Sequence, residues 1–299
     1  MRRLALLGVP SSTGAHWPGQ EKAPRVLREA GLVEWLESSG QAVSDLGDLP
    51  RTRFRPDPGH HPQSLEAVLR VVGSVADRVE RIVRDGQVPL VLGGDCTIEL
   101  GVISGFLRAG EDPALLYLDG GVDLFTPATN PTGILDSMVI AHMIGEPGAA
   151  EELARGGPRF PLMEDEKIVL FGYEPNPPET PVLQRRYMPR YPAGNVRDRP
   201  RELAAEAVAL LEDLAERFVV HFDVDVIDFV DLPVADVPQH NAGLKFEEAI
   251  ACLATFAASP AFGGLVITEF NPDHADENGE MAARFVRRVV GALNAAGGG

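Results

Sequence analysis

The sequence predicts an α/β protein, a three-layer α/β/α sandwich built around a mainly parallel sheet. Short apolar runs recur along the chain, and each is followed by a segment in which apolar residues have helical spacing. Such runs are typical of strands that are buried on both faces. The alternation of strand and helix favours a parallel sheet with right-handed crossovers and a layer of helices on each side.

Six apolar runs are the expected strands. Each is short, rich in Leu, Val, Ile or Phe, and followed by a turn or by polar residues. The runs are LALLGV (4–9), VPLVLG (88–93), ALLYLD (114–119), KIVLFG (167–172), FVVHFDV (218–224) and LVITEF (265–270).

Three longer segments have the pattern of amphipathic helices that would pack on this sheet. The clearest spans residues 64–84, with Ser64 as its expected N-cap and Gly86 just beyond its end. Segments 201–217 and 279–294 repeat the pattern.

Two Pro-rich stretches, 49–62 and 173–200, have little periodicity and are expected to be long loops. Strand-helix units resume after each stretch, so neither is expected to be a linker between domains. We therefore expect a single domain over residues 1–299, with functional residues on some of its long loops.

The balance of charge limits the classes of partner. The chain has 44 acidic and 27 basic side chains, a formal net charge of −17. This charge repels nucleic acid phosphates and anionic lipid headgroups. We expect no nucleic acid or membrane partner, and a small, cationic molecule as the substrate.

Cysteine usage and hydropathy indicate a cytoplasmic protein. Cys96 and Cys252 are too few and too far apart in sequence for a disulfide framework. The apolar run near the start is only about five residues long before Pro10, which is too short for a secretory signal. No later run approaches the roughly 18 apolar residues that cross a bilayer.

Acidic residues follow the expected strands where each strand ends. Because the carboxyl ends of parallel strands form one edge of the sheet, we expect these side chains to gather there. They are Asp95, followed by Cys96, after strand 88–93, Asp119 and Asp123 after 114–118, Asp223 and Asp225 at the end of 218–224, and Glu269 after 265–268.

The D-x-D pair is the most specific of these signals. Asp223 and Asp225 leave the same face of an extended strand, about 7 Å apart along the chain. Two like charges side by side in a buried place need a cation near them, and Asp119 and Asp123 can converge on the same ion. The competing interpretation is that these aspartates are helix caps and turn residues.

Several separate blocks resemble the arginase/agmatinase (ureohydrolase) family. The resemblance covers essentially the whole chain, and the blocks occur in the family's order. They are GVPSSTG with APRVLREAGL (8–32), VLGGDC (91–96), LDGGVDLFTP (118–127), FDVDVID (222–228), NAGLKFEEA (241–249) and ITEFNP (267–272). The resemblance implies a three-layer arginase-like fold, a homo-oligomer (trimer or hexamer), and a Mn²⁺ pair that generates the hydroxide attacking a guanidinium carbon.

By this resemblance the family's acidic metal ligands fall on four aspartates. The bridging carboxylates correspond to Asp119 and Asp223, and the further ones to Asp123 and Asp225. The two histidine ligands are replaced: Cys96 stands where the family has GGDH, and Gly121 stands at the histidine of DAHxD.

Other departures concern the substrate and the proton. The family motif SGNLHG reads TGILDS here, from Thr132 to Ser137. Thr132 keeps a polar substrate-binding position, Ile134 loses one, and Asp136 replaces the proton-shuttling histidine and would carry a proton only with a raised pKa. Phe125 stands where arginases use an Asn for the amino-acid end of the substrate. Glu269 matches the glutamate that faces the guanidinium. Efficient hydrolysis of arginine is therefore not expected.

The number and identity of the metal ions stay open. Carboxylates suit Mn²⁺, and four aspartates neutralise two such ions on formal charge, but the position beside Gly121 keeps only Asp119, Asp223 and Asp225. A thiolate at Cys96 favours Zn²⁺ or Fe²⁺. One ion, two ions or none are the alternatives.

Two histidines have a possible role in the site. His221 lies on the same strand face as Asp223, one layer deeper, where a hydrogen-bonded core histidine is the competing interpretation to a metal ligand. His240 lies on a loop that borders the cleft in the family and is a candidate for substrate binding, against the alternative of a solvated loop residue.

Three functions follow from these observations. The first is a divergent metal-dependent hydrolase of a non-peptide C–N bond in a guanidino, ureido, formimino or amide compound, with Asp136 and Glu269 as catalytic residues. The second is a metal-poor, non-catalytic paralogue that binds a small cationic ligand or a partner. The third is an enzyme that reuses the pocket, with Cys96 as a nucleophile near a helix N-terminus or Asp136 in acid-base chemistry.

Overall fold

The computed structural model describes residues 2–174, 177–237, 240 and 242–294. Its centre is one eight-stranded sheet in the order β2-β1-β3-β8-β7-β4-β5-β6, and every pair of neighbouring strands is parallel. The strands are β1 (Arg3–Gly8), β2 (Ala42–Asp48), β3 (Val88–Leu92), β4 (Ala114–Leu118), β5 (Ile168–Phe171), β6 (Arg190–Tyr191), β7 (Phe218–Asp223) and β8 (Phe262–Thr268).

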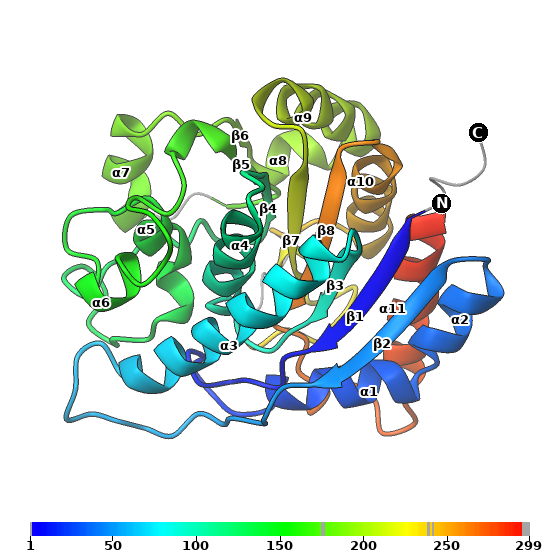
Figure 1. Ribbon diagram of the computed structural model, residues 1–299, viewed down its shortest axis with the longest axis horizontal. Helices are drawn as coiled ribbons and strands as arrows, with labels where there is room; N and C mark the ends of the chain where they lie inside the picture. Colours follow the sequence, from blue (N-terminus) through cyan, green and yellow to red (C-terminus); the bar gives the residue numbers. More distant parts are fainter. Residues whose placement is uncertain (1, 175–176, 238–239, 241, 295–299) are drawn as a thin grey trace.

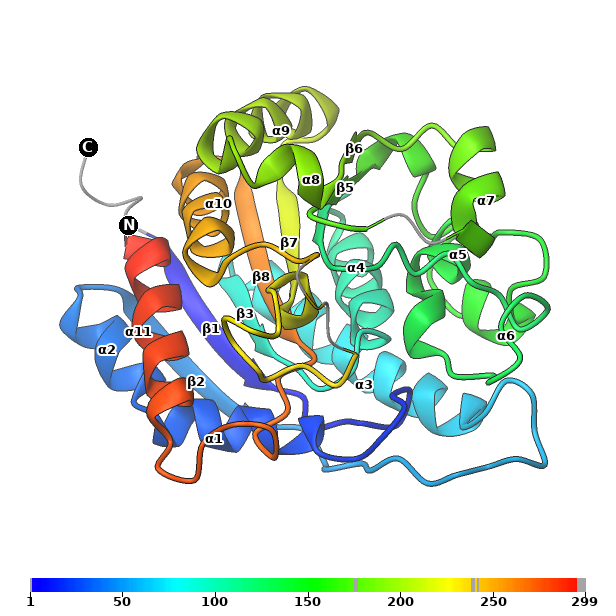
Figure 2. The same ribbon diagram turned by 180° about the vertical axis from the view of Figure 1, so that it is seen from behind.

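Helices cover both faces of the sheet, as Figures 1 and 2 show from opposite sides. One face packs against α3 (Leu65–Arg84), α4 (Ile98–Ala109), α5 (Val139–Met143), α6 (Glu151–Ala154) and α7 (Thr180–Arg185). The other packs against α1 (Ala23–Glu29), α2 (Leu32–Ser38), α8 (Ala193–Val196), α9 (Pro200–Leu214), α10 (Phe246–Ala258) and α11 (Glu280–Asn294). The predicted three-layer α/β/α fold is confirmed.

The central strands are buried on both faces, which explains their continuous apolar runs. In β7, Val219 belongs to the core beneath α3 and α4, whereas Val220 belongs to the core on the opposite face. All six residues of β7 are buried. Such a strand has no solvent-facing side on which polar residues are favoured.

Two strands were not predicted. Strand β2, AVSDLGD, lies at one edge of the sheet with its residues largely exposed, and β6 at the other edge has only two residues. Exposed edge strands tolerate charged and small residues, so neither carries the apolar run by which the other strands were identified.

The prediction that residues 173–200 form a loop is wrong in part, because this stretch contains α7, β6 and α8. These elements are too short for a periodic pattern to emerge from the sequence. Ser64 does precede α3, but it has a positive φ of 57° and its side chain makes no capping hydrogen bond. The expectation that the Ser64 side chain caps this helix is therefore wrong.

The strand order places the site at the middle of the sheet. Strands β3, β8, β7 and β4 are consecutive neighbours, and they are the four strands whose carboxyl ends carry the acidic residues and Cys96. Helix α4, which follows Cys96, packs closely on α3: a Cβ at Gly101 would lie 2.6 Å from the Val72 carbonyl oxygen. Among the described residues, no helix is both long and apolar enough to cross a bilayer.

Candidate functional site

A cavity of about 350 Å³ opens at the carboxyl edge of the sheet. Its described lining includes no Lys or Arg. His16, Phe125 and Val237 contribute to its walls. Eight carboxylates line it: Asp119, Asp123, Asp136, Glu174, Glu179, Asp223, Asp225 and Glu269. The structure thus brings the four aspartates and Glu269 together, as the sequence predicted.

Backbone amides orient three of the aspartates. The amide of Gly121 donates to Asp119 Oδ1 at 2.6 Å, that of Asp225 donates to Asp223 Oδ1 at 2.7 Å, and that of Gly120 donates to Asp225 Oδ1 at 2.8 Å. These bonds occupy one oxygen of each carboxylate. In the described part of the chain, Asp119 Oδ2 is buried without any hydrogen-bond partner, which is costly unless a further ligand supplies one.

Cys96 lies in the turn between β3 and α4, against Asp223. Its thiol donates to Asp223 Oδ2 at 2.8 Å, and its backbone amide donates to Asp136 Oδ1 at 2.7 Å. Burial and the negative charge of Asp223 raise the pKa of the Cys96 thiol well above its usual value. Without a cation the sulfur therefore stays protonated, and a protonated thiol is a weak nucleophile.

Two site residues have strained backbones. Asp123 has a φ of 46° and Glu269 a φ of 62°, in the left-handed region that non-glycine residues rarely adopt. The Tyr117 hydroxyl donates to Asp123 Oδ2, and the Gln20 side-chain amide donates to Glu269 Oε2. Strain retained at two positions of one cavity is typical of functional sites.

The carboxylates raise one another's pKa values. Burial, and then repulsion from Asp225, raises the pKa of Asp119 to about 7. Burial, and then repulsion from Asp95, raises the pKa of Asp136 to about 7. Burial and repulsion from Asp136 raise the pKa of Glu269 well above its usual value. In the absence of a cation, this cluster therefore retains protons near neutral pH.

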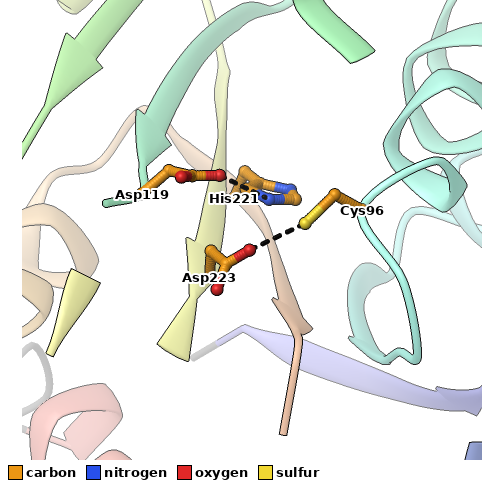
Figure 3. A group of neighbouring side chains, drawn as sticks. All are labelled: Cys96, Asp119, His221 and Asp223. Atoms are coloured by element: carbon orange, nitrogen blue, oxygen red, sulfur yellow. Dashed lines mark hydrogen bonds and ion pairs between the residues drawn. The ribbon is translucent and has the colours of Figure 1, made fainter. Parts of the chain in front are cut away.

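His221 joins the cluster from within the sheet. Its Nε2 lies 3.8 Å from Asp119 Oδ2, and its Nδ1 lies 3.0 Å from Glu99 Oε2. Figure 3 shows the imidazole between Asp119 and Cys96, above Asp223. The potential ligand atoms of Cys96, Asp119, His221 and Asp223 all lie within 4.8 Å of one another. His221 is the hydrogen-bonded core residue that the sequence suggested, and it is also within reach of the site.

The donor set offers mixed sulfur, nitrogen and oxygen ligands at one metal position and oxygen ligands alone at the other. A Cβ at Gly121 would lie 3.4 Å from Asp119 Oδ1 and 3.5 Å from Asp123 Oδ1. A histidine at this position would start beside both carboxylates, but glycine supplies no donor, so the second metal position has carboxylates alone. The first position combines a thiol, two carboxylates and a nearby imidazole, which are the donors that a single transition-metal ion prefers.

Two predicted substrate-binding residues lie elsewhere. Thr132 is exposed, and its hydroxyl donates to Asn130 Oδ1 at 2.7 Å, as in a local turn. His240 is also exposed, with its ring centroid 5.4 Å from that of Phe229. Neither is among the described residues that line the cavity, so neither contacts it in this structure. Asn241, in the block next to His240, lies outside the described residues.

Sequence reasoning missed several residues of the site. Gln20 and Glu179 lie in 3₁₀ helices of three residues, Gln20–Lys22 and Pro177–Glu179, which are too short for a periodic pattern in the sequence. Glu99 lies in the first turn of α4. Burial raises the pKa of Glu179 to about 7, although its Oε1 accepts a hydrogen bond from the Leu124 amide. For the residues around the metal cluster, the sequence offered one signal. His221 lies two residues before Asp223 on the same strand face, so it could be expected near the cluster.

Comparisons with known proteins agree with this fold. The model of the Arginase family matches residues 2–293. The arginase of Bacillus caldovelox is 26% identical over 97% of this chain and 99% of its own length. Among solved structures, Entamoeba histolytica arginase in complex with L-ornithine superposes with a TM-score of 0.87 at 20% identity, covering 98% of this chain and 99% of that one. The agmatine ureohydrolase of Thermoplasma volcanium gives a TM-score of 0.70 at 19% identity, covering 98% and 90%.

Proposed function

The chain belongs to the arginase family, and from this premise we propose that it is a metal-dependent hydrolase of a non-peptide C–N bond in a small cationic compound. The bond would be that of a guanidino, ureido, formimino or amide group. The observation that carries the proposal is the cavity itself, in which eight carboxylates surround a space of about 350 Å³. Concentrated negative charge of this kind is stabilised by cations, both a metal ion and a positively charged substrate.

The substrate would be a cation without a carboxylate of its own. The described lining contains no Lys or Arg to pair with such a group. Phe125 also presents a ring where a polar contact would be needed. A substrate carboxylate would thus be desolvated among like charges without a partner, which costs binding free energy. A decarboxylated amine or an amide avoids this cost.

Glu269 and Asp136 would act on the substrate directly. Gln20 donates to Glu269 Oε2, whereas Oε1 is buried without a partner in the described residues. This free oxygen can accept a hydrogen bond from an amidine N–H. With a pKa of about 7, Asp136 can hold or release a proton at its carboxyl group near neutral pH. A divalent ion bound by Cys96, Asp119 and Asp223 would lower the pKa of a water molecule and so supply the nucleophile.

We expect no efficient hydrolysis of L-arginine. We also expect tighter binding of L-argininamide, in which an uncharged amide replaces the carboxylate. L-Arginine and L-argininamide differ only in the carboxylate, so they are a matched pair of ligands. L-Argininamide should bind at least about tenfold more tightly, or about 1.4 kcal/mol, and urea release from L-arginine should remain near background with Mn²⁺ or Zn²⁺. Calorimetric titration and a urea assay measure the two quantities. Equal affinity, or urea release from L-arginine at an ordinary arginase rate, would contradict this substrate class.

The hydrolase proposal itself is tested with a panel of cationic guanidino, ureido, formimino and amide compounds, agmatine among them. Release of urea or ammonia from at least one compound is expected with the wild type, and its loss is expected in Glu269→Gln. Glu212→Gln is the matched control, because Glu212 lies outside the described cavity lining and accepts a hydrogen bond from the Ser259 hydroxyl, so its activity should be unchanged.

A second candidate is a non-catalytic protein that binds a small cation. The observation that favours it is the loss of both histidine ligands of the family, since Cys96 and Gly121 stand at those positions. Binding of panel compounds without hydrolysis of any of them, in metal-loaded protein, would support this candidate over the hydrolase. The high pKa of the Cys96 thiol weighs against the third possibility, a cysteine nucleophile.

A further inference from the structure

We propose that the metal ion of this chain is a single Zn²⁺ held by Cys96, Asp119, Asp223 and His221, displaced toward the sheet interior, with Glu99 orienting the imidazole. The inference rests on the proposed function, since it specifies the metal of the same site. It adds a ligand, His221 on β7, and a residue that orients this ligand, Glu99 on α4. His221 would supply the imidazole that the family has at the position of Gly121.

The His221–Glu99 pair has the arrangement of a metal-binding histidine. Both side chains are fully buried. Because a carboxylate accepts hydrogen bonds, Nδ1–H of His221 donates to Glu99 Oε2 at 3.0 Å, and this leaves the Nε2 lone pair facing the cluster. Metal-ligating histidines usually donate their other ring N–H to a carboxylate or carbonyl in this way. The Thr268 hydroxyl, 3.2 Å from Nε2, is a weaker partner that an ion would displace.

Asp119 presents an unused ligand atom to this imidazole. Its Oδ1 accepts from the Gly121 amide, on the side of the vacated histidine position, whereas Oδ2 is buried and unpartnered in the described chain. The distance from Oδ2 to His221 Nε2 is 3.8 Å. Two such atoms on one tetrahedral Zn²⁺ lie about 3.3 Å apart, given bonds of about 2.0–2.1 Å. A small side-chain movement therefore suffices.

Cys96 and Asp223 complete the set from the other side (Figure 3). The sulfur lies 2.8 Å from Asp223 Oδ2, with the thiol proton between them. When the ion binds, it replaces this proton, which leaves to solvent, and the S···O distance widens to about 3.5 Å around a tetrahedral centre. A set of one thiolate, one imidazole and two carboxylates favours Zn²⁺ over Mn²⁺, which prefers oxygen ligands.

The position remains open to the cavity. Cys96, Asp119 and Asp223 line the cavity, whereas His221 is not among its described lining residues. The imidazole would thus hold the ion from the sheet side, and water or substrate would approach from the opposite side as a fifth ligand.

The test is cobalt and zinc binding to variants of the full chain. Co²⁺ replaces Zn²⁺ and gives a thiolate-to-cobalt charge-transfer absorption if sulfur binds it. We expect one equivalent of Co²⁺ with this absorption in the wild type, its loss in Cys96→Ser, and Zn²⁺ affinity lowered at least about 100-fold in His221→Asn. Glu99→Gln should lower the affinity by about 10- to 100-fold. His142→Asn is the matched control, because His142 is equally buried but bonds Met138 and Ala150 instead, and its affinity should stay unchanged.

The outcomes separate the two proposals. Zn²⁺ affinity unchanged in both His221→Asn and Glu99→Gln overturns the His221 site and leaves the hydrolase intact, with the ion on the cavity-side carboxylates. Binding of two Mn²⁺ ions per chain, together with no thiolate-to-cobalt absorption when Co²⁺ is added, also overturns the His221 site and leaves the hydrolase intact. No binding of Zn²⁺, Co²⁺ or Mn²⁺ by the wild type overturns both. If His221→Asn does not fold, Glu99→Gln and Cys96→Ser decide the question.

Discussion

Zn²⁺ added to chelator-treated protein is expected to raise its melting temperature by about 5–10 °C. A ligand that binds only the folded state at 100 to 1,000 times its Kd stabilises that state by about 3–4 kcal/mol, and for a chain of this size each kcal/mol shifts the melting temperature by roughly 2 °C. The physical source is relief of repulsion among Asp119, Asp223 and their neighbours. Thermal melts with EDTA and with excess Zn²⁺ measure the shift.

The variant Asp223→Asn should abolish this response, because the ion loses a ligand and Cys96 loses its acceptor. In the presence of EDTA, the same variant should be as stable as the wild type or more stable, since a neutral amide removes one of several mutually repelling charges. Asp231→Asn is the control, because Asp231 lies outside the cavity and accepts from the Phe246 amide; its metal response should be unchanged. Melts that do not move with metal in the wild type would contradict a cation at this site.

The metal-free protein is expected to lose stability as the pH rises from 6 to 8.5, by roughly 3–5 kcal/mol. Acids whose folded-state pKa is raised bind protons in the folded state that the unfolded chain has already lost. Their stabilising contribution is complete below an unfolded pKa near 4 and disappears as the pH passes the folded pKa. These groups include Asp119, Asp136 and Glu179, each with a pKa of about 7, and Asp225, with a pKa of about 6. The pKa values of Asp123, Asp223 and Glu269 are also raised well above their usual range, so these groups act in the same direction.

Urea unfolding in EDTA at pH 6 and pH 8.5 measures this dependence. His142 works in the opposite direction: burial lowers its pKa to about 4, so its protonation in the unfolded chain reduces stability as the pH falls below 6.5. That effect is below about 1 kcal/mol at pH 6. Saturating Zn²⁺ should flatten the dependence, because the ion replaces the protons. Stability that is constant or rises toward pH 8.5 in EDTA would show that the carboxylates are neutralised in another way.

The fold could be predicted wherever burial alone determines the residue type. Strands β7 and β3 are covered by helices on both faces, so their residues are almost continuously apolar and visible in the sequence. Strand β2 lies at an exposed edge, where AVSDLGD satisfies the backbone without an apolar pattern. Helices α7 and α8 are short segments fixed by tertiary packing, and no local period reveals them.

The site residues could likewise be predicted where strand burial and strand order determine their position, and not elsewhere. Asp119, Asp223 and Glu269 could be placed because each ends or directly follows a buried strand, and parallel strands end at one edge. Glu99 could not be placed, since its contact with His221 depends on how α4 is rotated against the sheet. Gln20 and Glu179 come from segments without a repeating pattern. The residues missed are those whose position depends on the packing of elements rather than on strand order.

The most direct measurement of the central claim, a single divalent cation among these carboxylates, is the metal content of the protein purified without chelator. Elemental analysis should find about one zinc ion per chain, lost on dialysis against a strong chelator and absent from Asp119→Asn purified in parallel. Two manganese ions per chain would contradict the single displaced site, and no bound metal after Zn²⁺ is supplied would contradict the metal centre altogether.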